Sequence, residues 1–212
     1  MPRPVAAIFA AIFAALALLL AGCGSSGGPS PQASDLVGQD QVGDFHGAGL
    51  DPPQPRPSFT LHDTSGKPFA FGTETAQHPT FLFFGYTHCP DVCPTTMADV
   101  AAALRGAAEP IRRDALVVFV TTDPARDTGP VLAAWLRRFD SDLPSRFVGL
   151  TGSQSQLVAA QVAARVPVAE DDGQTHSAEL LLFGTDDYAR VVYLDGSSPQ
   201  DIQHDLPAVA RG

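Results

Sequence analysis

Two continuous apolar runs, separated by a segment with helical spacing, constrain the fold of this chain most strongly. They occupy residues 80–86 and 115–121 and are rich in aromatic and β-branched side chains. Runs of this kind are typical of central strands that are buried on both faces of a sheet. Between them, apolar residues recur at helical spacing over 97–104, and Pro94 suits the first turn of a helix. The pattern therefore predicts a sheet whose neighbouring strands are connected by a helix.

The rest of the folded part continues this alternation. Residues 57–71 alternate apolar and polar side chains around a turn, which predicts an N-terminal β-hairpin. The last two predicted strands also form a hairpin, so the sheet is expected to be mixed and flanked by helices, in an α/β fold. Further strands are predicted at 147–150, 179–183 and 190–194, and further helices at 130–139, 153–165 and 199–206.

The N-terminus has the pattern of a secretion signal. Arg3 precedes an apolar run over residues 5–20, and the sequence then reads Leu-Ala-Gly-Cys up to Cys23. The run is shorter than the roughly 18 to 20 apolar residues that span a bilayer. Residues 1–22 resemble a bacterial lipoprotein signal peptide, and Cys23 is then the lipidated N-terminus. An uncleaved membrane anchor is the alternative; either one predicts a protein held at the extracytoplasmic face of the cell membrane.

Composition divides the remaining chain into two parts. Residues 23–57 are rich in Gly, Ser and Pro and are interpreted as a flexible tether, which leaves residues 58–212 as one folded domain. Removal of residues 1–22 would take away one basic and no acidic residue, leaving 12 basic against 23 acidic residues and a formal charge of −11. This charge argues against binding to nucleic acid, and predicts that the lipid alone contacts the membrane.

Cys89 and Cys93 lie where the first central run gives way to the helix that begins near Pro94. A helix N-terminus favours the thiolate form, which binds soft metals and exchanges disulfides. The three intervening residues allow either a shared metal ion or a disulfide that fixes the start of the helix. Two thiolates favour Cu(I), whereas structural zinc takes four ligands. Spacing alone leaves metal binding and disulfide formation open.

A third ligand would come from another part of the chain, and imidazole is a common partner for copper. His176 follows the turn-like residues 170–173 and precedes a predicted buried strand, so its loop could reach the cysteines. His88 could tune the acidity of Cys89 or contact a partner. Asp123 ends the second central run and could adjust the charge at the site. The alternatives are a hydrogen-bonded loop histidine and an aspartate that caps its own turn.

Four motifs in this chain resemble those of the Sco/SenC family of copper chaperones for cytochrome c oxidase. The first is the sequence FFGYTHCPDVCPTT at residues 83–96. The others follow in the family's order: DPARDT at 123–128, GLTGS at 149–153 and HSA at 176–178. Together they cover the predicted folded domain.

The resemblance implies a thioredoxin-like fold to which the N-terminal β-hairpin is added. It implies that Cys89, Cys93 and His176 bind a copper ion as Cu(I), with Cu(II) as an open alternative. It also implies delivery of copper to the copper A centre of cytochrome c oxidase subunit II, with other copper chaperones as further partners. The chain departs from the family pattern at Gln174 and Thr175, because the family usually has an acidic residue directly before the histidine.

Other activities fit the same cysteines. Cys89 and Cys93 could be the redox pair of a thiol–disulfide reductase that keeps the copper A cysteines reduced. Their spacing, which is not Cys-x-x-Cys, argues against this. A thioredoxin-like peroxidase is a third and weaker interpretation, because two closely spaced cysteines and a distant histidine suit metal chemistry better.

Overall fold

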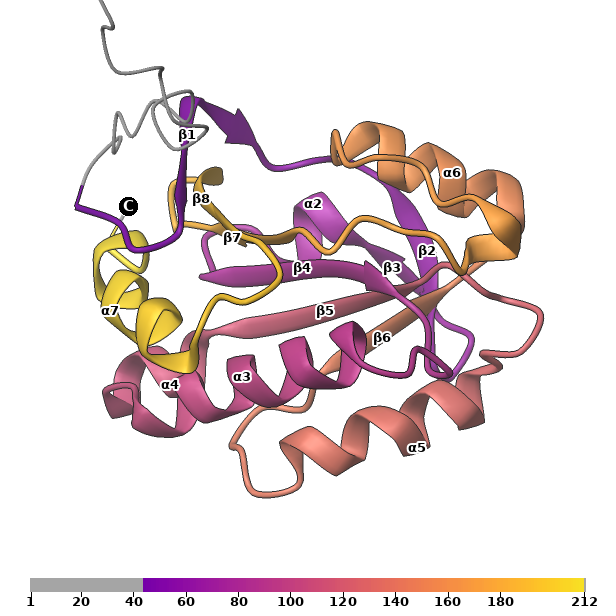
Figure 1. Ribbon diagram of the computed structural model, residues 1–212, viewed down its shortest axis with the longest axis horizontal. Helices are drawn as coiled ribbons and strands as arrows, with labels where there is room; N and C mark the ends of the chain where they lie inside the picture. Colours follow the sequence, from indigo (N-terminus) through magenta and orange to yellow (C-terminus); the bar gives the residue numbers. More distant parts are fainter. Residues whose placement is uncertain (1–43, 212) are drawn as a thin grey trace, which may run out of the picture. The chain divides into compact units, whose positions relative to one another are not determined.

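A computed structural model describes residues 44–211, and the predictions for residues 1–43 lie outside this part (Figure 1). Its centre is an eight-stranded sheet in the order β1-β8-β7-β4-β5-β6-β2-β3. The strands are β1 Ala48–Pro55, β2 Thr60–Asp63, β3 Pro68–Ala70, β4 Thr80–Gly85, β5 Leu116–Thr121, β6 Val148–Thr151, β7 Leu180–Phe183 and β8 Tyr188–Tyr193. The helices are α2 Phe71–Glu74, α3 Val92–Gly106, α4 Glu109–Asp114, α5 Gly129–Asp140, α6 Gln154–Ala163 and α7 Pro199–Val209, and a short 3-10 turn, η2, covers Asp171–Gly173.

The sheet is mixed, as predicted. β4, β5 and β6 run parallel, whereas β7 pairs antiparallel with β4 and β8 pairs antiparallel with β7. β2 and β3 form the predicted N-terminal hairpin, and β2 joins the sheet by antiparallel pairing with β6. The α/β fold with an added hairpin is therefore confirmed. Among residues 44–211, no helix combines the length and the apolar character needed to cross a membrane.

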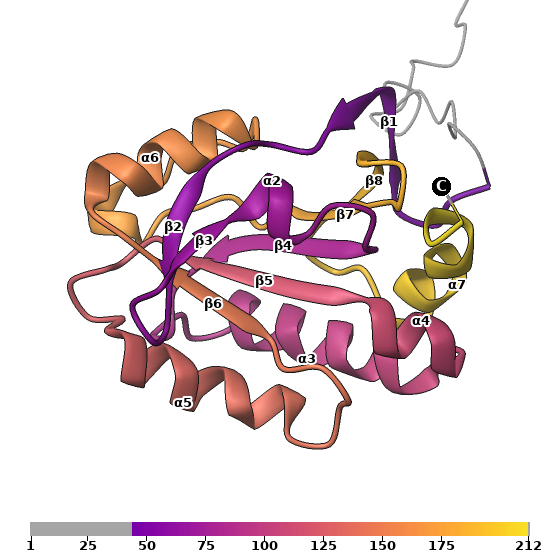
Figure 2. The same ribbon diagram turned by 180° about the vertical axis from the view of Figure 1, so that it is seen from behind.

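Helices cover both faces of the sheet (Figures 1 and 2). The alternation of side chains along β4 shows how this divides the core. Phe81 and Phe83 point to the cluster formed with α3, α5 and α7, whereas Leu82 and Phe84 point to the cluster formed with α2 and α6. All four side chains are fully or almost fully buried. Burial on both faces explains why this strand has a continuous apolar sequence.

The prediction that residues 23–57 form a tether is wrong for β1. This strand pairs antiparallel with β8, with a register shift between Gly49 and Gln54. The segment before it is held by Asp205 of α7, whose carboxylate accepts hydrogen bonds from the backbone N–H groups of His46 and Gly47, both at 2.9 Å. Gly and Pro are unusual in strands, but an edge strand tolerates them.

Arg56 also belongs to the folded part rather than to a tether. Its side chain is 3% exposed and donates hydrogen bonds to Asp187 at 2.7 Å and to Thr75 at 2.9 Å. It also donates to the backbone carbonyl groups of His78 and Gly184. A buried guanidinium is stable only with such partners. The folded domain thus includes residues N-terminal to position 58.

Candidate metal centre

The two cysteines occupy the loop and first turn that connect β4 to α3. Because β4 and β5 are parallel, their carboxyl ends meet at one edge of the sheet, where such folds place their sites. Cys89 lies in the loop and is half-buried, whereas Cys93 is the second residue of α3 and is fully buried. Both are free thiols. The backbone N–H of Cys93 points to the Cys89 sulfur at 3.4 Å.

Gly85 at the end of β4 makes room for the Cys93 sulfur. A β-carbon at this position would lie 2.7 Å from Cys93 Sγ and 2.8 Å from the Phe83 ring. Both separations are shorter than atoms in contact allow, so any larger side chain would displace the sulfur. The absence of a side chain at Gly85 therefore helps to fix where Cys93 sits.

His176 reaches the cysteines from the loop between η2 and β7. Its Nε2 lies 3.3 Å from Cys93 Sγ, and the ligand atoms of His176, Cys89 and Cys93 all lie within 4.8 Å of one another. The edges of the Phe83 and Tyr86 rings pack against the imidazole, with centroids 6.0 and 5.5 Å away. The structure brings the three predicted ligands together, although His176 lies 83 residues after Cys93 in the chain.

The hydrogen bond on the other side of the imidazole determines which nitrogen can bind a metal. His176 Nδ1 lies 2.8 Å from the backbone carbonyl oxygen of Ser177, which can only accept. Nδ1 therefore carries the proton, and Nε2 presents its lone pair toward Cys93. Burial lowers the pKa of His176, which keeps the ring neutral. This is the arrangement typical of a histidine that binds a metal.

The expectation that the helix N-terminus favours the thiolate is wrong for Cys93. Burial raises the pKa of the Cys93 thiol well above its ordinary value and outweighs the neighbouring backbone N–H group. Cys93 is therefore a thiol in the metal-free protein. A metal that binds there must displace its proton.

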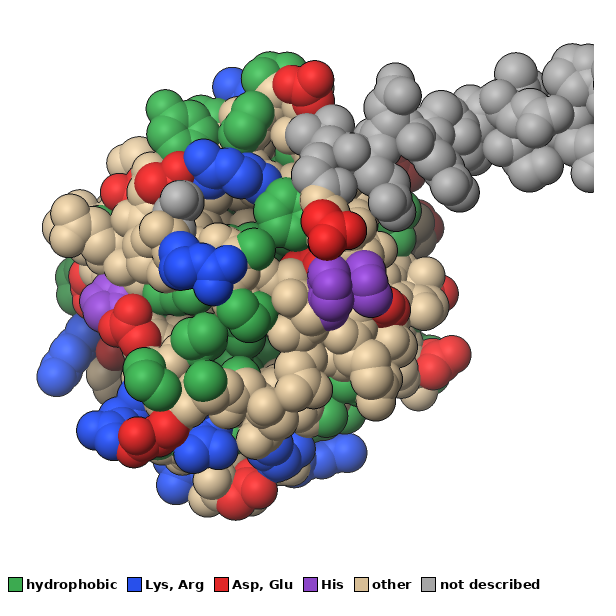
Figure 3. Space-filling view, turned by 90° about the vertical axis from the view of Figure 1, so that its left-hand side faces the viewer, with side chains coloured by type: hydrophobic (Ala, Val, Ile, Leu, Met, Phe, Trp, Pro, Cys, Tyr) green, Lys and Arg blue, Asp and Glu red, His purple; other side chains and the backbone are tan. Residues whose placement is uncertain are grey.

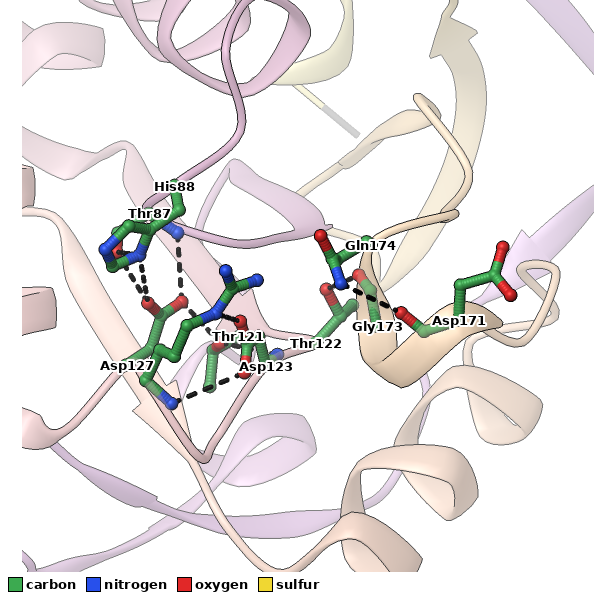
Figure 4. A network of polar contacts seen from close by, with 10 residues as sticks. Thr87, His88, Thr121, Thr122, Asp123, Asp127, Asp171, Gly173 and Gln174 are labelled. Atoms are coloured by element: carbon green, nitrogen blue, oxygen red, sulfur yellow. Dashed lines mark hydrogen bonds and ion pairs between the residues drawn. The ribbon is translucent and has the colours of Figure 1, made fainter.

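A buried carboxylate that the sequence interpretation did not single out holds the cysteine loop in place (Figure 4). Asp127 is fully buried, and its carboxylate accepts hydrogen bonds from the backbone N–H of Thr87 at 2.9 Å and from the Thr87 hydroxyl at 2.5 Å. It also accepts from the hydroxyl of Thr121, at the end of β5, at 2.7 Å. Asp127 thus ties the residue two positions before Cys89 to the central sheet.

Removal of the Asp127 carboxylate is expected to weaken both the fold and the metal site. In Asp127→Ala the N–H and two hydroxyl groups lose their acceptor, and unsatisfied buried donors cost about 1–3 kcal/mol each. Because Thr87, which carries two of these donors, is only half-buried and water can reach it, we expect the free energy of unfolding to fall by about 2–4 kcal/mol in denaturant titrations. Asp127→Asn, which keeps an acceptor of the same shape, is the control. Equal stability of Asp127→Ala and wild type would show that the carboxylate does not anchor the loop.

Asp123 and His88, the two residues predicted to act beside the ligands, contact their neighbours in sequence. Asp123 pairs with the Arg126 side chain and accepts from the Arg126 backbone N–H at 3.3 Å, so it caps its own turn. His88 has a side chain that is 55% exposed. Its Nδ1 lies 3.1 Å from the Thr87 hydroxyl and 3.8 Å from the Asp127 carboxylate (Figure 4).

The loop that carries His176 is fastened at its base to the end of β5. Gly173 has a φ of +87°, and a β-carbon there would lie 1.9 Å from the backbone oxygen of Thr122. The Thr122 hydroxyl donates to the Gly173 carbonyl at 2.6 Å. Gln174 and Thr175, which stand where an acidic residue was expected before His176, form the end of this tight turn.

Gly173→Ala is expected to displace this turn and with it His176. The added methyl group cannot fit against the Thr122 carbonyl, so we expect metal affinity to fall by about 10–100-fold, the range found when groups that orient ligands are changed. Gly66→Ala is a matched control, because Gly66 has a similar φ of +85° but open space around its β-carbon position. Competition titrations with a chelator measure the metal affinity of both variants. Equal affinities of the two variants would contradict the role of the turn.

The donor set of the site fits a soft metal ion. Two sulfurs and one neutral imidazole nitrogen suit Cu(I), which accepts two or three ligands, better than structural zinc, which takes four. Among residues 44–211, no other three His, Cys, Asp or Glu side chains come so close together. The fold and the site define a thioredoxin-like domain with a Cys–Cys–His centre at the edge of its sheet.

Comparison with known proteins agrees with this class. The SCO1/SenC family model matches residues 48–211, and the chain therefore belongs to the SCO1/SenC family. A candidate copper-binding protein of Stutzerimonas stutzeri is 36% identical over 139 residues, which are 61% of this chain and 64% of that relative. The match thus spans slightly less than two thirds of the length of this curated relative.

Solved structures of related proteins have the same fold. The crystal structure of Arabidopsis thaliana ScoI with copper bound superposes with a TM-score of 0.64 at 26% identity and covers 74% of this chain and 98% of that one. The solution structure of apo Sco1 from Thermus thermophilus gives a TM-score of 0.66 at 28% identity, with 77% and 96% covered. The predicted thioredoxin-like fold is confirmed.

Proposed function

We propose that the protein is a copper chaperone that binds copper through Cys89, Cys93 and His176. The observation that carries the proposal is the convergence of two sulfurs and one imidazole nitrogen within 4.8 Å. The copper held by the Arabidopsis thaliana relative supports it. Two thiolates favour Cu(I), and the imidazole also gives the site a ligand that Cu(II) prefers.

Delivery of the copper requires that an incoming ligand reach it. Cys89 is half-buried and lines an open hollow together with His176, whereas Cys93 is fully enclosed. Exchange would therefore begin at Cys89. We propose that the acceptor is the copper A centre of cytochrome c oxidase subunit II, which membership in the family supports, and that other copper chaperones are further partners.

The proposal includes attachment to the extracytoplasmic face of the cell membrane through a lipid on Cys23. The signal-like sequence over residues 1–22 supports it. The segment from Cys23 to the start of the described domain would then act as a tether that lets the copper site reach membrane-bound partners. The N-terminal part of residues 23–57 thus remains a predicted tether.

A deletion strain tests the chaperone role. Cytochrome c oxidase activity is expected to fall in the deletion strain and to recover when copper is added to the medium. The wild-type gene should also restore activity, whereas a Cys89→Ser gene should not. Full oxidase activity in the deletion strain without added copper would contradict the proposal.

Thiol–disulfide reduction is the second candidate, because Cys89 is accessible and lies beside Cys93. The Cys89 thiolate would attack a target disulfide and form a mixed disulfide, with one target sulfur leaving as a thiolate. The Cys93 sulfur, once deprotonated, would then attack Cys89, releasing the second target thiolate and forming the Cys89–Cys93 disulfide. Oxidase activity that stays low at high copper, together with a mixed disulfide trapped in Cys93→Ser, would favour this role.

A further inference from the structure

A hollow next to the metal centre has no role in binding the metal. It has a volume of about 270 Å³ and lies between α3, the start of β7, the end of β8 and α7. Its apolar part consists of Leu180, Tyr193, Leu194 and Ile202, and α3 contributes Thr96 and Asp99.

This hollow adjoins the one over the metal centre. The second hollow, of about 340 Å³, is lined by Cys89, Val92 and His176 among others, and both hollows share Ala178. The two hollows therefore adjoin at Ala178, and we call them together the α3 groove. It leads from the accessible thiol of Cys89 to Leu194. A partner that takes copper from Cys89 must cover at least the first part of it.

The α3 groove is acidic. Asp91, Asp99 and Asp195 line it, and no Lys or Arg of the described residues does. Asp99 is half-buried, and burial raises its pKa with no hydrogen bond or charge from the described residues to offset it. A carboxylate that is partly desolvated without a donor is stabilised when a cationic group pairs with it.

The far end of the groove offers an apolar contact. Leu194 is 53% exposed, one of the few large hydrophobic side chains exposed to this extent in the described part of the chain. It follows Tyr193, and both residues line the same hollow. The Tyr193 ring is buried and donates its hydroxyl hydrogen to Asp205 at 3.0 Å. An exposed leucine beside a preformed hollow is the kind of feature that an apolar side chain of a partner covers.

The arginines of α3, α4 and α5 lie in the last turns of these helices, whereas Arg126 lies over the Tyr86 ring, which packs against His176. Figure 3 shows Lys and Arg side chains along the lower edge of the face that lies at the left of Figure 1, and further groups of them in its upper half. α3 carries Arg105 in its last turn, at the end opposite to the cysteines, and α4 and α5 carry pairs of arginines in theirs. The acidic lining of the groove, with Asp91, Asp99 and Asp195 and no lining Lys or Arg, would attract a basic partner.

We propose that the α3 groove is the docking surface for the copper-accepting protein, and that it receives a segment of that protein carrying a Lys or Arg beside an apolar side chain. The cation pairs with Asp99 and the apolar side chain covers Leu194, which places the acceptor's own ligands at Cys89. This inference rests on the proposed function, because it requires an acceptor that takes copper from Cys89.

Charge reversal at Asp99 tests the inference. The probe is the metal-free soluble domain of subunit II from the same organism, mixed with the full-length protein loaded with Cu(I) in detergent. Asp99→Lys is expected to slow copper transfer at least 10-fold and to weaken binding of the domain, and Leu194→Asp is expected to act in the same direction. Asp114→Lys introduces the same charge change at the end of α4 and should transfer at the wild-type rate. Cu(I) affinity should be unchanged in all three.

The possible results test the docking surface and the chaperone role separately. If Asp99→Lys and Asp114→Lys transfer copper equally well, the groove is not the docking surface, although the chaperone role stands. If the wild-type protein binds Cu(I) but neither binds the subunit II domain nor transfers copper to it, both the acceptor and the groove are wrong. Asp99→Asn, which keeps the shape of the side chain, shows whether a loss in Asp99→Lys comes from charge rather than from misfolding.

Discussion

Cys93→Ser is expected to lower the affinity for Cu(I) by at least about 100-fold, because changes to groups that only orient ligands already cost about 10–100-fold. The Cys93 sulfur is fully buried and lies 3.3 Å from His176 Nε2, so no solvent ligand can replace it. Serine is close to cysteine in shape and should leave the fold intact. Titration with a Cu(I) chelator under reducing conditions measures the change.

Cys23→Ser is the matched control for this prediction. It removes the third cysteine of the chain and should leave the Cu(I) affinity of detergent-solubilised protein unchanged. Circular dichroism would confirm that both variants are folded. A Cys93→Ser protein that holds Cu(I) within a few-fold of wild type would exclude the buried thiolate as a ligand.

His176→Ala is expected to remove Cu(II) binding more completely than Cu(I) binding. Two thiolates can hold Cu(I) by themselves, whereas Cu(II) depends more on imidazole. The substitution leaves a space between the Phe83 and Tyr86 rings that pack against the imidazole, and free imidazole should enter it. Copper absorption and electron paramagnetic resonance spectra, recorded with and without added imidazole, measure the loss and the rescue.

His78→Ala is the control for the imidazole prediction. The His78 side chain is 43% exposed and pairs with Asp114 at 2.8 Å, and His78 precedes β4 whereas the cysteines follow it. The His78→Ala protein should bind Cu(II) and Cu(I) with wild-type affinity. If His176→Ala also keeps both affinities, the metal centre is not the group of three side chains described above.

The central strands of the sheet could be predicted from the sequence, whereas the edge strand β1 could not. β4 and β5 could be recognised because strands buried on both faces have continuous apolar sequences. β1 could not, because its glycine and prolines are typical of a linker. Its pairing partner β8 lies far away in the chain, and the contacts of Arg56 with Asp187 and Gly184 are equally distant in sequence.

The metal ligands could be predicted from the sequence, but the residues that hold them in place could not. Cys89 and Cys93 could be identified from their position after the first central run, and His176 from its motif. Asp127 was missed although it belongs to the DPARDT motif, because nothing local shows that its carboxylate turns toward Thr87. Asp123, the first acid of that motif, instead pairs with Arg126.

The acidity of the thiols also depends on packing that the sequence does not display. A helix N-terminus lowers a thiol pKa. Full burial of Cys93 against Gly85 and Phe83 raises it by more. The outcome could be decided only once the depth of the residue in the core was known.

The central claim is that one copper ion binds to two sulfurs and one imidazole nitrogen of a single chain. X-ray absorption spectroscopy of the full-length protein loaded with Cu(I), together with its copper-to-protein ratio, tests it most directly. The account predicts one copper per chain, with two sulfur ligands and one nitrogen ligand, and loss of the nitrogen ligand in His176→Ala. A spectrum with sulfur ligands only in the wild-type protein, or one copper shared by two chains, would contradict it.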